Sequence, residues 1–131
     1  MLSGYSFARV TTATQGVPMS ELPCPCCGFL TLEDTYGSYV ICPVCNWEDD
    51  GVQLANPTSA GGANSRSLAD AQGRAIERYP LHIEVAGGFR RGKHWRPLSE
   101  ADIAAADERR ALSHWHTQAV SDEAEAYWQV A

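Results

Sequence analysis

Four cysteines arranged as two Cys-x-x-Cys motifs constrain the fold of this 131-residue chain more than any other feature. The first motif joins Cys24 to Cys27, the second joins Cys42 to Cys45, and a proline follows the first cysteine of each. A tight turn of this kind directs two sulfur atoms at one point, and two such turns complete the tetrahedron that Zn²⁺ prefers with thiolates. The spacing therefore predicts one zinc site with these four ligands.

Disulfides and iron are the competing explanations of the same cysteines. The count of five is odd, each pair is too close in sequence for an ordinary disulfide, and residues 1–17 lack the layout of a secretory signal. We therefore expect reduced thiols in a cytoplasmic protein. Iron remains the rival metal, because rubredoxin-type sites use the same paired turns and tetrahedral geometry does not separate the two metals.

The fifth cysteine, Cys26, lies inside the first motif. We interpret it as a buried spare thiol, because free cysteine commonly packs as a small hydrophobic residue. The alternative is a reactive thiol beside the metal, which requires solvent exposure.

The pattern of apolar and turn residues predicts an α+β fold, a small zinc-ribbon hairpin packed with two to three α-helices. Residues 29–32 and 38–41 are expected to pair as its strands. A helix is predicted over 68–79, ending before Pro80, and a short strand over 81–85. Another helix is expected to start after the cap Ser99 and to carry one apolar face as far as Ala119, followed by a short helix from Ser121.

The length is typical of one domain, which we divide into three segments. Residues 1–18 are expected to be an N-terminal extension, with Met19 as a possible true start of the protein. Residues 19–98 are expected to form the zinc-binding domain, and residues 99–131 a helical segment packed on it. No run of the sequence approaches the roughly 18 apolar residues that a membrane helix needs.

Charge is distributed unevenly along the chain, whose net charge is −6. Residues 66–96 carry an excess of positive charge, whereas the segments before and after them are acidic. Nucleic-acid binding is not expected of a chain that is acidic around its metal motifs, because affinity for the phosphate backbone comes mainly from cationic contacts.

Two charged runs are the candidate partner-binding residues. The acidic run follows Trp47 and consists of Glu48, Asp49 and Asp50. It is typical either of a turn or helix cap with solvated charges or of a surface for a basic partner. Trp47 is expected to pack beside the metal turn, and the alternative is that it takes part in partner binding with these acids. The basic run contains Arg90, Arg91 and Lys93, which either pair with the chain's own acids or bind a partner.

Catalysis is not expected, because four thiolates close the zinc shell that a catalytic site keeps open for water. No Ser-His-Asp pattern or His-Glu-x-x-His helix occurs in the sequence, and a small-molecule substrate is not expected. His114 and His116 are two residues apart and so do not share a helix face that could bind a metal.

Several segments in order carry a resemblance to a known family. These are Cys24–Leu32, Cys42–Gln53, Gly61–Ala71 and the later Arg96–Leu98. Over about residues 19–98 the chain resembles the bacterial cysteine-rich CPCC domain family. The resemblance implies a compact domain containing a zinc ribbon rather than a particular reaction, and it marks residues 47–51 and 61–64 as pattern residues of unknown role.

The sequence as a whole favours a structural-zinc protein that acts as a protein-interaction module. Its size and acidity suggest an unknown basic protein partner, as for an immunity or antitoxin protein that blocks a cationic toxin. The alternatives are a rubredoxin-like iron electron carrier and a nucleic-acid-binding zinc ribbon that uses residues 90–96.

Overall fold

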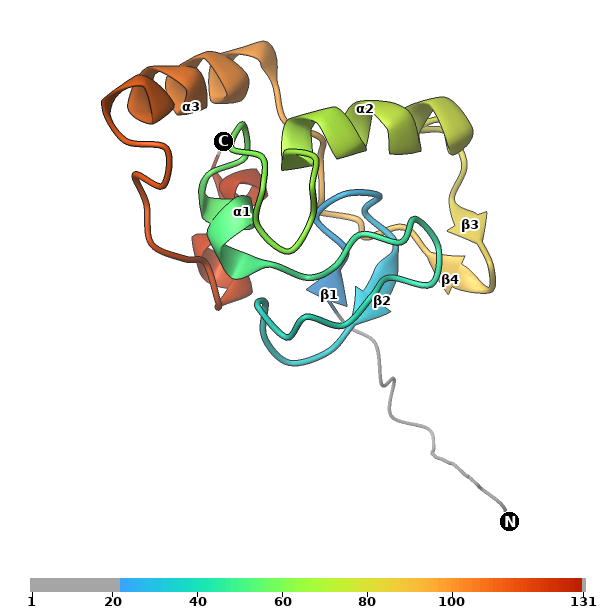
Figure 1. Cartoon of the computed structure of the whole chain (residues 1–131). Coiled ribbons are helices and arrows are strands. Elements are labelled where there is room, and N and C mark those ends of the chain that lie inside the picture. Colours follow the sequence, from blue (N-terminus) through green and yellow to red (C-terminus); the bar gives the residue numbers. More distant parts are fainter. Residues whose placement is uncertain (1–21, 131) are drawn as a thin grey trace.

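A computed structural model describes residues 22–130 (Figure 1). The predictions for residues 1–18 and for Met19 lie outside the described residues. Within residues 22–130, three helices and two small antiparallel sheets confirm the α+β class. In chain order the elements are β1 (Leu22–Pro23), β2 (Leu30–Leu32), α1 (Gly51–Ala55), α2 (Leu68–Arg78), β3 (Val85–Ala86), β4 (Phe89–Arg90), α3 (Glu100–Leu112) and the 3-10 turns η1 (Glu123–Glu125) and η2 (Tyr127–Gln129).

Each cysteine motif lies at the end of its own short hairpin. β1 pairs with β2 on either side of the first motif. Residues 39–41 pair instead with residues 48–49 on either side of the second motif, where the Tyr39 N–H donates to the Asp49 carbonyl at 2.9 Å. The predicted pairing of 29–32 with 38–41 was therefore wrong. The chain reverses at each motif, so each strand meets its partner across its own turn.

The starts of α2 and α3 match the predicted capping residues, whereas the end of α3 does not match its prediction. Ser67 caps α2, which ends at Arg78, and Ser99 forms a capping box with Asp102 at the start of α3. α3 ends at Leu112, well short of Ala119, because the next residues leave the helix to contact the 56–60 loop.

Other local predictions also needed correction. The helix α1 was not predicted, and the strand expected over 81–85 is reduced to β3, which pairs with β4. The helix expected from Ser121 is replaced by the two 3-10 turns, the first of them capped by Asp122. Elements this short depend on the contacts of the folded chain more than on local propensity.

The C-terminal segment packs against the part of the chain that carries the cysteines. The Val120 N–H donates to the Gly51 carbonyl at 2.9 Å, and the Tyr36 N–H donates to the Ser121 carbonyl at 2.8 Å. Trp128 is buried with its ring edge-on to Tyr36, at 5.9 Å between centroids. In Figure 1, α2 and α3 lie on one side of the molecule, and β1 and β2 lie on the opposite side. The cysteines belong to the same buried core as these aromatic rings.

Candidate metal centre

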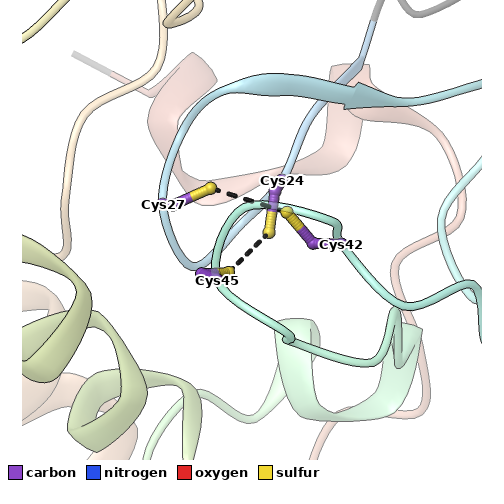
Figure 2. A group of neighbouring side chains, drawn as sticks. All are labelled: Cys24, Cys27, Cys42 and Cys45. Atoms are coloured by element: carbon purple, nitrogen blue, oxygen red, sulfur yellow. Dashed lines mark hydrogen bonds between the residues drawn. The ribbon is translucent and has the colours of Figure 1, made fainter. Parts of the chain in front are cut away.

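The four predicted ligands converge on one point between the two turns (Figure 2). Their Sγ atoms all lie within 4.8 Å of one another, with Cys24 and Cys45 at 3.6 Å and Cys27 and Cys42 at 3.8 Å. A tetrahedral zinc ion with Zn–S bonds of about 2.3 Å requires sulfur atoms about 3.8 Å apart. The spacing of the sulfurs therefore fits one tetrahedral metal ion.

The two turns share one backbone design. In the first, the Gly28 N–H donates to the Cys24 carbonyl at 2.8 Å, and in the second, the Asn46 N–H donates to the Cys42 carbonyl at 2.9 Å. Gly28 and Asn46 both have positive φ, of 82° and 69°. Glycine and asparagine tolerate this conformation best, so the residue after each motif is matched to its turn.

The environment of the sulfurs is suited to a cation. Cys24, Cys27 and Cys42 are buried and Cys45 is half-buried. The Cys42 Sγ accepts hydrogen bonds from the Thr31 hydroxyl at 3.2 Å and from the Val44 N–H at 3.4 Å, both of which favour a thiolate. Such interactions tune and orient metal-bound sulfur.

Four thiolates cannot coexist here without a positive ion. Burial, followed by hydrogen bonds with the neighbouring thiols, raises the pKa of Cys24 well above its ordinary value. Hydrogen bonds from Cys24 and then Cys27 lower the pKa of Cys42 to about 7, and hydrogen bonds led by that from Cys24 lower the pKa of Cys45 far below its usual range. In the metal-free chain, the sulfurs thus compete for protons and do not all ionise together.

Cys26 is buried as predicted, with 2% of its surface exposed, and it lies outside the cluster of four sulfurs. A hydrogen bond to Cys45 and then burial raise the pKa of its thiol. Both effects oppose formation of the reactive thiolate.

The acidic run does not form the expected partner surface, because Asp49 is 1% exposed and Asp50 is 5% exposed. Asp50 caps α1, its Oδ1 accepting from the N–H groups of Val52 and Gln53. The Asp49 Oδ2 accepts from the N–H and the hydroxyl of Ser38. The interpretation as a helix cap was correct for Asp50, but the charges are not solvated.

Trp47 and Glu48, the two residues before Asp49, differ in their surroundings. Trp47 is 3% exposed and packs in the core with the cysteines, as predicted for a residue beside the metal turn. Its carbonyl accepts from the Cys42 N–H at 2.9 Å. Glu48 is half-buried. A partner surface built on this run therefore retains Glu48 alone of its three acids.

The Gly-Gly-Ala-Asn loop of residues 61–64 covers the buried acids. The Asn64 side chain accepts from the Glu48 N–H at 2.9 Å and donates to the Glu48 carbonyl at 2.8 Å. The Ala63 N–H donates to the Asp50 Oδ2 at 2.8 Å, and a Cβ on Gly62 would lie 2.6 Å from the same oxygen. The loop thus closes over the segment that follows the second motif, which gives these pattern residues a structural role.

Gln53 joins this network, and sequence reasoning did not single it out. It is fully buried, and its Nε2 lies within 3.2 Å of the carbonyls of Ser59, Asn64 and Arg66. A glutamine three residues after Asp50, on an unpredicted helix, gives no local sign of burial.

The basic run divides into an internal residue and two exposed ones. Arg91 donates to the Cys27 carbonyl at 3.0 Å and to the carbonyls of Tyr79, Pro80 and Ile83 at 2.9 Å, with its guanidinium 4.3 Å from the centre of the Phe29 ring. Within residues 22–130 Arg91 forms no ion pair, so the alternative that it pairs with the chain's own acids is wrong. Arg91 instead joins the first cysteine turn to the chain after α2.

Arg90 and Lys93, the other two cations of the basic run, are exposed. Within residues 22–130, neither lies in an ion pair. They remain available to a partner.

Four converging cysteine sulfurs on two short reversed turns define a metal-binding protein of zinc-ribbon-like construction. The model of the family described as Cysteine-rich CPCC matches residues 22–79. This segment, which contains all four ligands, is thus similar to the cysteine-rich CPCC family. No curated protein matches the chain. None of the helices within residues 22–130 has the length and apolar character needed to cross a bilayer.

Proposed function

We propose that the metal centre is a structural Zn²⁺ site and that the protein is an interaction module built around it. The observation that carries this proposal is the set of four sulfurs within 4.8 Å, which fills every position of a tetrahedral ion. Such a shell leaves no place for the water or substrate of a catalytic zinc, so no reaction is assigned to the metal. Bound zinc would neutralise half of the charge of four thiolates.

The metal would hold together two turns that are otherwise weakly supported. β1 has two residues and β2 has three, while the second hairpin has a single bridge. Isolated pairs of this length are marginal in water. Structural zinc supplies folding free energy directly, because its ligands are brought together only in the folded state.

Removing the metal tests this role. The protein is treated with a chelator under reducing conditions and followed by the dispersion of its amide NMR signals. We expect loss of dispersion in residues 22–56, with recovery when one equivalent of Zn²⁺ is added back. A metal-free protein with an unchanged spectrum would rule out a structural metal.

We propose that the module binds a protein partner, although the acidic run no longer supports a partner that is basic. Asp49 and Asp50 are buried, so an immunity- or antitoxin-like role loses most of the residues on which it depended. The cysteines among residues 22–130 are all unpaired. This supports the proposal that the protein works in a reducing compartment such as the cytoplasm.

An iron electron carrier is the second candidate, and one observation favours it. Cys45 is half-buried and lines a groove open to solvent, which gives a redox partner an approach to the metal. Elemental analysis and the visible spectrum separate the candidates. Stoichiometric zinc in a colourless protein supports the structural site, and stoichiometric iron in a red protein supports the carrier.

A further inference from the structure

All seven basic residues between positions 66 and 96 line one of two grooves. Three of them, Arg66, Arg74 and Arg78, line a groove of about 540 Å³ beside Cys45. The other four line a groove of about 710 Å³, here called the basic groove, which has an apolar floor. We propose that the basic groove binds an acidic, partly apolar peptide segment of a partner protein. This inference rests on the proposed interaction role and names the partner's chemistry.

The basic groove lies where three parts of the chain meet. Pro23 and Leu30 come from β1 and β2, Leu81, Ile83 and Glu84 come from the turn after α2, and most of the rest comes from β4 and the segment that follows it. Glu123 of η1 completes the lining. Leu81 is 50% exposed. The volume of the basic groove is within the range of roughly 300–1,000 Å³ that is typical of ligand sites. The apolar side chains of this floor would contact apolar side chains of a ligand.

The charge of the groove favours an anionic occupant. Four basic residues and two acidic ones, Glu84 and Glu123, line it, so positive charges exceed negative ones by two. Arg91 is occupied by backbone carbonyls, and Arg96 forms an ion pair with Asp102 at 2.6 Å.

Two cations of the groove are left for a ligand. Arg90 and Lys93 are exposed, and within the described part of the chain no acid lies close enough to pair with them. They are placed to meet the carboxylates of a segment whose apolar side chains lie on the floor.

A peptide suits this combination better than a nucleic acid. Nucleic acids bind chiefly through many phosphate contacts, and a protein of net charge −6 with two available cations in the groove offers few of them. A short segment with two or three carboxylates meets the available cations, and its apolar side chains match the floor.

The groove beside Cys45 is the weaker candidate. Arg74 and Arg78 face a metal site whose four thiolates and one divalent ion carry excess negative charge, so a partner is not needed to explain them. The same two arginines are exposed, which makes them a matched control for Arg90 and Lys93.

The test begins with the zinc-loaded full chain and a random dodecapeptide library displayed on phage. The enriched peptide is synthesised with a fluorescent label, and its Kd is measured by fluorescence anisotropy. We expect enrichment of sequences that combine Asp or Glu with Leu, Ile or Phe. The double variant R90Q/K93Q should bind about tenfold more weakly, from the loss of two exposed charge contacts.

The control R74Q/R78Q removes the same charge from the other groove and should change the Kd less than twofold. A second pair tests the floor, with Leu81→Ser expected to weaken binding severalfold and Leu112→Ser, which is 81% exposed and outside the groove, to leave it unchanged. Amide NMR spectra confirm that each variant is folded.

Several results would overturn the inference. These are no enriched peptide, enrichment of basic peptides, equal losses in R90Q/K93Q and R74Q/R78Q, or binding of labelled single-stranded DNA in preference to the peptides. Zinc content is measured on the same samples. One zinc per chain without peptide binding refutes the groove and leaves the metal centre standing, whereas peptide binding by a folded chain that retains no zinc refutes structural zinc and supports the groove.

Discussion

Gly28, the residue that closes the first cysteine turn, should be among the positions least tolerant of substitution. It has a φ of 82°, and a Cβ added to it would lie 2.3 Å from Cε3 and 2.5 Å from Cδ2 of Trp95. Real Cβ atoms essentially never approach ring carbons this closely, and Trp95 is buried, so its indole cannot turn out into solvent. Replacement of Gly28 by alanine must therefore displace either the indole or the turn that carries Cys27.

The size of the effect follows from two separable contributions. A left-handed conformation costs a residue with a Cβ roughly 1–2 kcal/mol. Overpacking in a well-packed core costs about 1–3 kcal/mol more. Gly61 provides the matched control, because its φ is 91° but nothing lies within 4 Å of an added Cβ. We expect Gly61→Ala to lower the free energy of unfolding by about 1–2 kcal/mol and Gly28→Ala by about 2–5 kcal/mol.

The measurement is urea unfolding of both variants and the wild type at one fixed excess of free zinc, because bound metal adds to apparent stability. The difference between the two variants isolates the clash with Trp95. Equal losses in Gly28→Ala and Gly61→Ala would show that the indole does not pack against the turn, and the described position of Trp95 would be refuted. A smaller loss of stability in Gly28→Ala than in Gly61→Ala would also refute the position of Trp95.

Two further predictions concern the surroundings and the charge of the centre. Arg91→Lys should lower the free energy of unfolding by about 2 kcal/mol, because an ammonium cannot reproduce the guanidinium's hydrogen bonds to four carbonyls, each contributing roughly 0.5–1.5 kcal/mol. The control Arg90→Lys should change the free energy of unfolding by no more than about 0.5 kcal/mol. Equal urea midpoints for Arg91→Lys and Arg90→Lys would refute the role of Arg91. Zinc affinity should fall as pH falls, because the pKa values of Cys24 and Cys27 are raised above 9.0 in the metal-free chain and both thiols must lose a proton to bind. Measured by competition with a chromophoric chelator, the zinc affinity should change by about two decades per pH unit above pH 7. Below pH 7 it should change more steeply, because Cys42, with its pKa of about 7, takes up a proton there. A pH-independent affinity would contradict this.

The ligand set was predictable because its signal is local. Two Cys-x-x-Cys turns with proline inside each specify sulfurs that point together, whatever the rest of the chain does. The helix starts at Ser67 and Ser99 were predictable for the same reason, since a cap acts on the first turn that follows it. The left-handed conformation of Gly28 and Asn46 is also local to the turns, because glycine and asparagine are the residue types that tolerate it best.

Strand pairing and burial were less predictable, because they depend on segments distant in sequence. The burial of Asp49 and Asp50 depends on Ser38 and on the 61–64 loop, which together supply hydrogen bonds for both carboxylates. A run of three acids gives no sign of such partners. Arg91 was misassigned for a similar reason, since its carbonyl partners lie on the first cysteine turn and after α2.

The central claim is that Cys24, Cys27, Cys42 and Cys45 bind one zinc ion while Cys26 does not. Native mass spectrometry of the wild type and of each cysteine-to-serine variant, prepared under reducing conditions, tests it directly. We predict one zinc per chain in the wild type and in Cys26→Ser, and strongly reduced zinc occupancy in each of the other four variants. A wild type without metal, or loss of zinc in Cys26→Ser with retention in Cys27→Ser, would contradict the assignment.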